Sequence, residues 1–550
     1  MPANTPATQL ATELVDHRLA TDHEWALSKG DLTYLERWPD VSLEGLAQQA
    51  RAWQSFAARA AQVRPTSSGD ATLLETIAFT ASAQATQMRW REELRWVNPA
   101  MGMIPNIFTF LPRYPLVTAE HGQRYLAKLA AFPAFVDQWM DRLRAAGAAP
   151  IEHLVSGSIG LLDRHLAHPL SEGSLGRQAA PTDLDGAPAQ AWQAQMHAAL
   201  DGGVTAALDR LRETLREHTL PLARPDDQPG LVHLPGGAEL YEQLVSAHTS
   251  IDADAATVHQ VGLAQVARLE SEYLAIAGPI VGTEDVATIH RRLREDPSLH
   301  YTDVATLVAD ATAALARATA AAPGWFGVLP QAPCTAESID QGPLAFYSQP
   351  ARDGSKPGVF FFNTSDPSMW ATFQLQAVTY HEGVPGHHLQ LAIAQEDPEM
   401  HPLLADYYIA AYNEGWGLYT ERLSDEMGLY SSALDRVGML SADSMRACRL
   451  VVDTGMHALG WTREQAIDYM LDNSPMSRVQ VTGEVDRYIG SPGQALGYMM
   501  GRLEIDRMRS EAHARLGDRF DLSGFHDVVL STGSVPMSTL NRVVQEWQGT

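Results

Sequence analysis

The segment 380-YHEGVPGHHLQ-390 decides the reading of this chain, because it places three histidines and a glutamate around a Pro-Gly pair. In the pattern His-Glu-x-x-His, residues four apart lie on one face of a helix, so two imidazoles can bind one metal ion. Here Pro385 occupies the position of the second histidine. The segment is therefore either a histidine-rich helix end or a metal site rebuilt around a break in the helix.

Neither later histidine would lie ideally on a continuous helix. His388 would point within about 20° of His381 but about 10 Å further along the axis, and His387 would be rotated well away. Proline removes a backbone hydrogen bond and glycine permits a turn without a side-chain clash, so the break could bring a later histidine back. Glu382 stands beside His381, where a metallohydrolase needs its general base.

A second predicted helix, 407–428, offers a third ligand in Glu414. It also contains Gly415 and Gly417. Each glycine costs a helix about 1 kcal/mol relative to alanine, which indicates that another helix or an ion approaches closely. A His, His, Glu set leaves one coordination position open for water. Two acidic residues near the same face could orient a ligand histidine, or could simply be solvated: Glu421 and Asp425.

Helical periodicity dominates the chain, with clear examples at 120–147 and 254–278. The run 358-GVFFFNT-364 predicts a strand, which is either buried on both faces or free to pair with an extended peptide, with Asn363 as its one candidate polar contact. The motif helix is expected to begin near Pro367. Its apolar residues are spaced as one buried stripe: Trp370, Phe373, Ala377, Tyr380 and Val384.

Composition excludes several partners. Acidic residues outnumber basic ones by 66 to 40, and the formal charge of −26 disfavours nucleic acid and anionic membrane surfaces. The two cysteines, Cys334 and Cys448, fit neither a disulfide framework nor a cysteine-based zinc site and are expected to be reduced. No secretory leader and no membrane-spanning run stand out, so we expect a cytoplasmic protein.

Two downstream segments contain candidate helpers. In 449-RLVVDTGMHALG-460, Arg449, Asp453 and His457 are four residues apart, so His457 could donate to an oxyanion, although an intrahelical ion pair with a structural histidine is the alternative. The other segment, 491-SPGQALGYMMG-501, is expected to open a helix with a capping box. Near this segment, Arg487 could bind a substrate carboxylate, and Tyr488 and Tyr498 could donate hydrogen bonds to a substrate. The alternative is that the tyrosines belong to the core and the arginine to the surface.

These residues resemble the domain-of-unknown-function family 885, whose signature is HExxPGH. The resemblance implies that His381 and His387 are metal ligands and Glu382 the general base. Because the signature fixes the histidine directly after Pro-Gly, His388 is only the fallback ligand. The family also looks related to the gluzincin zinc peptidases, and 413-NEG-415 resembles their glutamate-donating helix, which implies that Glu414 is the third ligand. Less specific likeness extends over 234–249, 343–364, 449–470, 487–501 and 525–536.

The sequence thus predicts a mostly α, large multi-helix zincin-like metallohydrolase fold with a small β-sheet beside the active-site helix. The chain is expected to form an N-terminal helical lobe, 1–340, and a metal-binding catalytic lobe, 341–550, or one continuous unit over 1–550. The predicted activity is zinc-dependent hydrolysis of amide bonds in short peptides; another divalent first-row metal would fit the same ligands. The alternatives are hydrolysis of a non-peptide amide or ester, and a non-catalytic metal-stabilised scaffold that binds peptides.

Overall fold

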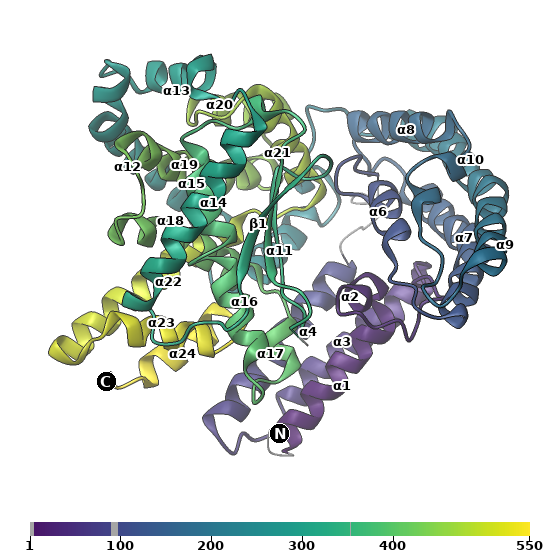
Figure 1. Cartoon of the computed structure of the whole chain (residues 1–550), viewed down its shortest axis with the longest axis horizontal. Helices are drawn as coiled ribbons and strands as arrows, with labels where there is room; N and C mark the ends of the chain where they lie inside the picture. Colours follow the sequence, from purple (N-terminus) through teal and green to yellow (C-terminus); the bar gives the residue numbers. More distant parts are fainter. Residues whose placement is uncertain (1–4, 90–96, 353, 550) are drawn as a thin grey trace.

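The computed structural model describes residues 5–89, 97–352 and 354–549. It is mostly helical with one three-stranded sheet, so the predicted fold class is confirmed at this level. Figure 1 shows three regions: purple helices at the bottom, a blue helical bundle at the right, and a larger body of teal, green and yellow helices that holds the sheet. The functional candidates all lie in that larger body.

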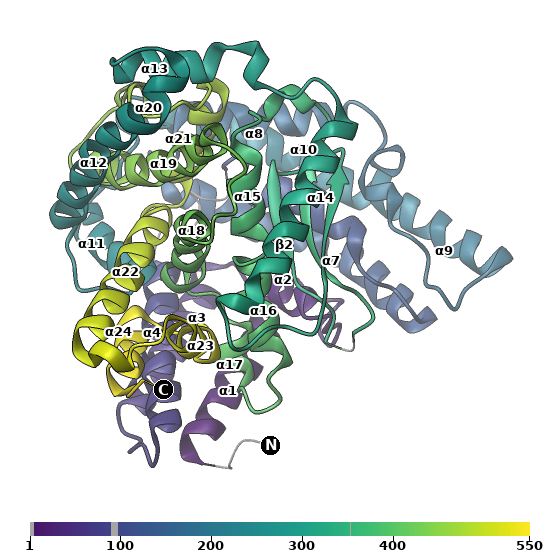
Figure 2. The ribbon, with the colours of Figure 1, turned by 60° about the vertical axis from the view of Figure 1, so that its left-hand side comes forward.

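The N-terminal helices pack on one another around Trp53 and Phe56, and this cluster also takes in Leu403 and Tyr407 from far along the chain. The next bundle has its own core around Trp139 and stands at the edge of the molecule, with α9 outermost in Figure 2. The helices of these two regions are α1 (Pro6–Thr21), α2 (His23–Ser28), α3 (Leu43–Ala60), α4 (Ser68–Arg89), α6 (Met103–Phe110), α7 (Ala119–Ala146), α8 (Glu152–Leu166), α9 (Gly186–Ala199) and α10 (Thr205–Thr214).

The larger body begins before residue 340. Its helices are α11 (Gly237–Thr249), α12 (Ala255–Val281), α13 (Val286–Glu295), α14 (Val304–Ala321), α15 (Gln374–Glu382), α16 (His387–Glu396), α17 (Pro402–Asp406), α18 (Ala410–Glu426), α19 (Ala433–His457), α20 (Arg463–Asp472), α21 (Arg478–Gly490), α22 (Leu496–Leu516), α23 (Leu522–Ser531) and α24 (Met537–Glu546). α12 packs along α19, and α14 packs on α15. Packing between helices therefore crosses the predicted boundary at 340, and the division of the chain into lobes stays a prediction.

The sheet lies beside the motif. β3 (Gly358–Asn363) is its central strand, parallel to β1 (Cys334–Ile339) and antiparallel to β2 (Ala345–Ser348). Phe360 and Phe362 are fully buried. Val359 and Phe361, on the opposite face, are half-buried, so burial on both faces is confirmed only in part. Peptide pairing by 358–364 is wrong, because both of its edges already carry a strand. At the end of the strand, the side-chain amide of Asn363 donates to the Gly342 carbonyl oxygen and so stabilises a turn.

Helix starts near the motif differ from the sequence expectation. Asp366 caps only a 3₁₀ turn, Pro367–Met369, and α15 starts seven residues later. The predicted apolar stripe is nevertheless buried throughout. The capping box at Ser491 does not form, because the Gln494 N–H donates to the Ser491 carbonyl oxygen and the Gln494 side chain accepts from Arg487. α22 begins only at Leu496. Both expectations placed the helix start too early.

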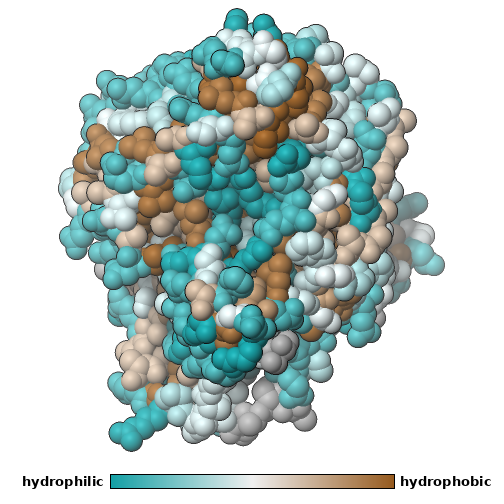
Figure 3. Space-filling model, turned by 90° about the vertical axis from the view of Figure 1, so that its left-hand side faces the viewer, coloured by the Kyte–Doolittle hydropathy of each residue, from teal (hydrophilic) through white to brown (hydrophobic). Residues whose placement is uncertain are grey.

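The segment Val304–Gly324 is long and apolar enough to span a membrane, with a mean hydropathy of 1.2, although no such run was expected from the sequence. This is weak evidence, since α14 contacts α15 and β1 and contributes Leu307, Ala311 and Leu315 to the core. On the face shown in Figure 3, hydrophobic patches are separated by hydrophilic surface. Cys334 and Cys448 are both free, as expected.

Candidate metal centre

The motif segment forms a helix, a tight turn and a second helix. His381 lies in the last turn of α15, and His387 is the first residue of α16. A Cβ on Gly386 would lie 1.9 Å from the His381 carbonyl oxygen, so the turn packs against α15 at a distance that only glycine allows. The two imidazoles have ring centroids 4.8 Å apart and planes at 85°. The predicted return of His387 towards His381 is confirmed.

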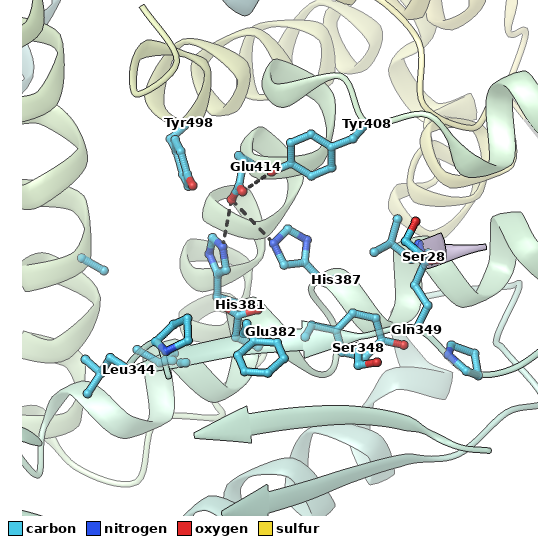
Figure 4. A pocket seen from close by; sticks show the side chains of 18 of the residues that line it. Ser28, Leu344, Ser348, Gln349, His381, Glu382, His387, Tyr408, Glu414 and Tyr498 are labelled. Carbon is cyan, nitrogen blue, oxygen red and sulfur yellow. Dashed lines mark hydrogen bonds and ion pairs between the residues drawn. The ribbon is translucent and has the colours of Figure 1, made fainter. Parts of the chain in front are cut away.

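Glu414 on α18 completes the cluster, and its carboxylate faces both imidazoles (Figure 4). Its Oε2 is 3.3 Å from Nε2 of His381 and 3.6 Å from Nε2 of His387. One ligand atom from each of the three residues lies within 4.8 Å of the others. Two imidazole nitrogens and one carboxylate oxygen suit zinc and leave a coordination position open. The residues present therefore fit a divalent metal ion.

The glycines of α18 have the close contacts that the sequence indicated. A Cβ on Gly417 would lie 2.7 Å from Cε1 of His381, so the ring rests directly on the helix backbone. A Cβ on Gly415 would lie 2.6 Å from the backbone of Gly501, where α22 crosses. One glycine thus admits the ligand histidine and the other admits a neighbouring helix.

Glu421 holds His381 from behind. Its Oε1 accepts a hydrogen bond from Nδ1 of His381 at 2.8 Å, and the carboxylate is almost completely buried. This contact fixes the ring so that Nε2 points towards Glu414. Asp425 has a different role, because it forms a two-point ion pair with Arg436 away from the cluster.

The cluster has the electrostatics of a buried charged group. Burial lowers the pKa of His381, but its hydrogen bonds to Glu414 and Glu421 outweigh that effect and raise the pKa to about 9. Burial raises the pKa of Glu414, and its hydrogen bonds with His381 and His387 bring it well below the usual glutamate value. Glu414 therefore remains an ionised carboxylate that can balance a bound cation.

A cleft of about 1700 Å³ opens at the cluster and is lined by all three candidate ligands. Segments of α2, β2, α19 and α21 form its other walls. Glu382, the last residue of α15, also lines the cleft, and its carboxylate forms no hydrogen bond within the described part of the chain. Its carboxylate is thus available to a water or substrate in the cleft.

Two tyrosines flank Glu414 from the cleft side (Figure 4). Tyr408 donates a hydrogen bond to Oε1 of Glu414, the oxygen that faces away from the imidazoles. Tyr498 points towards Glu414, and within the described residues its hydroxyl has no hydrogen-bond partner. Burial and the nearby Glu414 carboxylate raise the pKa of Tyr498 to about 12, so it stays a donor near neutral pH. Tyr498 was predicted from the sequence as a phenolic donor. Tyr408 was not, because it lies just before α18 and no helical spacing relates it to the other candidate residues.

His388 does not face the cluster. Its Nδ1 is 2.9 Å from the Tyr347 hydroxyl, and its Nε2 is 3.1 Å from the Ala332 carbonyl oxygen. A carbonyl can only accept, so Nε2 donates and Nδ1 accepts. Both ring nitrogens are therefore engaged with the sheet region, and the fallback ligand is wrong on geometric grounds.

Three predicted helpers do not line the cleft. His457 is fully buried, accepts from the Leu231 N–H and donates to the Tyr488 carbonyl oxygen, and burial lowers its pKa to about 3. It is a neutral structural histidine. The Tyr488 hydroxyl donates to Glu484, and Arg487 binds both Glu484 and Gln494. These side chains stabilise the packing of α19 on α21 and do not contact the cluster.

Comparisons with known proteins give a family whose activity is not known. A family model described as "Bacterial protein of unknown function (DUF885)" matches residues 24–544. A solved structure of a candidate lipoprotein from Colwellia psychrerythraea is 27% identical, with 98% of each chain covered and a TM-score of 0.89. Another, of a candidate lipoprotein of unknown function from Shewanella oneidensis, is 20% identical, covers 98% of this chain and 100% of its own, and shares the fold with a TM-score of 0.78. No curated protein matches.

Proposed function

This chain belongs to the DUF885 family of bacterial proteins, and from its site we propose that it is a zinc-dependent hydrolase of amide bonds in short peptides. One observation carries the proposal: His381, His387 and Glu414 converge at the wall of a large cleft, and beside them lies Glu382, whose carboxylate is unpaired among the described residues. A purely structural metal site would be closed by a fourth protein ligand and would need no neighbouring base. The likeness to gluzincins is part of this proposal.

The mechanism assigns each side chain one task. Zinc, when bound, supplies Lewis acidity that polarises a carbonyl and lowers the pKa of water towards ~7. Glu382 takes a proton from the attacking water and passes it to the leaving amine, which balances the hydrolysis. Tyr498 donates a hydrogen bond to the oxyanion that develops from the carbonyl oxygen. Tyr408 and Glu421 position Glu414 and His381.

A peptide suits the cleft because one wall is a strand edge. β2 pairs with β3 on one side only, and each of its residues from Ala345 to Ser348 lines the cleft. Within the described residues no strand pairs with its other edge. Backbone groups on such an edge can hydrogen-bond an extended peptide, which a small ester or non-peptide amide would not use.

The cellular location is proposed only by analogy. The cytoplasmic location expected from the sequence stays a prediction. Both solved relatives are described as candidate lipoproteins, and a lipoprotein of this kind is anchored to a membrane by a lipid. We therefore propose the cell envelope as the alternative to the cytoplasm.

The decisive experiment is elemental analysis of purified wild type beside His387→Ala and Glu414→Ala. We expect about one zinc per chain in wild type and a loss in both variants. His388→Gln is the matched control, because its amide can still donate to the Ala332 carbonyl oxygen and it should keep the metal. Glu382→Gln should keep the metal and lose turnover on a peptide library by about 10²-fold or more. Full turnover in Glu382→Gln, or no metal in zinc-incubated wild type, would refute the proposal.

A further inference from the structure

One face of α19 forms a wall of the cleft and carries two arginines. Ser441, Ala442, Met445, Arg446 and Arg449 recur every three or four residues and all line the cleft. The spacing Arg449, Asp453 and His457 that the sequence pointed to runs the other way along this helix, and neither Asp453 nor His457 lines the cleft. The arginines are at the end of the cleft wall nearest Tyr498.

Arg446 lies close to the candidate metal ligands. Its Nη2 is 3.7 Å from Oε1 of Glu421, the carboxylate oxygen that holds His381. Its side chain is 11% exposed, and its buried Nε has no hydrogen-bond partner among the described residues. Its Nη1 donates to the Ala442 carbonyl oxygen at 3.4 Å, so this bond and the 3.7 Å contact with Glu421 use only part of the five guanidinium donors. A buried guanidinium in that state calls for an anionic partner.

Arg449 is held rigidly in the same wall. Its Nε donates to the Tyr488 hydroxyl at 2.8 Å, and its Nη2 donates to Glu484 at 2.7 Å. The guanidinium carbon is 4.4 Å from the centroid of the Tyr498 ring. Nη1 is buried and has no hydrogen-bond partner in the described part of the chain. The group is therefore pre-oriented beside the tyrosine that points at Glu414.

The two arginines are the cationic side chains of this wall of the cleft. Arg446 contacts Glu421 and Arg449 pairs with Glu484, and the carboxylates of Glu382 and Glu414 line the same cleft. The chain as a whole carries −26. In so acidic a protein, guanidinium donors that face a cleft without a full set of partners favour a negatively charged part of the substrate.

We propose that Arg446 and Arg449 form a subsite for the free C-terminal carboxylate of the peptide, which makes the protein a carboxypeptidase or dipeptidase. Arg446 is separated from the ligand His381 by one side chain, Glu421. A carboxylate bound there lies near the scissile bond, so an internal bond of a long peptide would not be presented. The inference rests on the proposed function and adds its polarity and substrate class.

The test compares N-acetylated tripeptides that end in a free acid with the same peptides ending in an amide. In wild type the acids should be cleaved with kcat/KM about tenfold or more above the amides. Arg446→Met should lower kcat/KM for the acids by about tenfold, mainly through KM, and should lower it clearly less for the amides. Arg446→Lys should recover part of the loss. Arg436→Met, an arginine of the same helix outside the cleft, is the matched control.

Equal cleavage of acids and amides by wild type would overturn the subsite and leave the hydrolase intact. An equal loss for both substrates in Arg446→Met would also overturn it and make Arg446 a positioning group for Glu421. Should wild type hold no metal and cleave nothing, the proposed function fails separately. Calorimetric binding of an acid and its amide then tests the subsite alone: preference for the acid that Arg446→Met removes supports it, and equal binding refutes it.

Discussion

The imidazole of His381 rests on the backbone of Gly417, at a point where a Cβ would lie 2.7 Å from the ring carbon Cε1. Glu421, one turn further along the same helix, hydrogen-bonds the other side of the ring at 2.8 Å. α18 therefore supplies the candidate ligand Glu414, the glycine backbone on which His381 packs, and the Glu421 carboxylate that orients His381. The candidate metal centre depends on this helix as much as on the histidine motif.

Gly417→Ala should lower zinc affinity by about tenfold or more, because the added methyl group displaces the His381 ring. Competition with a chromophoric chelator would measure the affinity. Gly160→Ala is the control, since its Cβ would meet only Arg164 Nη1 at an ordinary 3.7 Å in helix α8. Equal zinc affinities for wild type and Gly417→Ala would show that the contact does not position the ligand.

Glu421→Gln should lower zinc affinity by about 10- to 100-fold while the chain remains folded. The amide oxygen can still accept from Nδ1 of His381, but the negative charge that strengthens the imidazole as a ligand is lost. The same titration on Asp425→Asn serves as control, because Asp425 pairs with Arg436 outside the cluster. If Asp425→Asn lowered zinc affinity as strongly as Glu421→Gln does, the orienting role of Glu421 would be refuted.

Local rules and the family resemblance together predicted the cluster, since the signature was needed to choose His387 over His388. The Pro-Gly break and the glycines of α18 are features whose steric meaning can be derived within one or two helical turns. The structure brings His381, His387 and Glu414 together as those rules and the family resemblance indicated. The coarse fold followed from periodicity in the same way.

The residues around the cluster that could bind substrate or an oxyanion could not be predicted reliably, because their roles depend on contacts between helices that are distant in the sequence. His457 is four residues from Asp453 on one helix face, yet it is buried against Leu231 and Tyr488. Conversely, Arg446 faces the cleft only because α19 packs beside α18. The predicted helix start near Ser491 was wrong for a similar reason, since Arg487 binds the side chain of Gln494 and Asp453, on another helix, binds the Gly493 N–H.

Tyr498→Phe and Tyr408→Phe should separate catalysis from metal binding. Tyr498 has a free hydroxyl towards the cleft, so its loss should lower kcat by about 10²- to 10³-fold with zinc retained. Tyr408 donates to Glu414, so its loss should mainly weaken zinc binding. Steady-state kinetics and zinc titration on both variants check this. A lower kcat for zinc-loaded Tyr408→Phe alone, with Tyr498→Phe unaffected, would reverse the two assignments.

His153 predicts a pH dependence of stability away from the site. It lies on α8, with Nδ1 2.7 Å from Oδ1 of Asp226 and Nε2 2.8 Å from Oδ1 of Asp486 on α21. Both nitrogens can donate only in the protonated ring. Burial lowers the pKa of His153, but the hydrogen bonds and charge of Asp486, with the hydrogen bond to Asp226, outweigh it and raise the pKa above its ordinary 6.5.

Because the folded-state pKa is raised, the stabilisation by His153 is fully present below pH 6.5 and is lost as the pH rises through the folded value. The melting temperature of wild type should therefore exceed that of His153→Gln at about pH 6, and the difference should shrink towards about pH 9. His168→Gln, an exposed histidine just beyond the same helix, should melt like wild type throughout. A difference between wild type and His153→Gln that stayed constant over this range would mean that the ring is neutral in the folded protein.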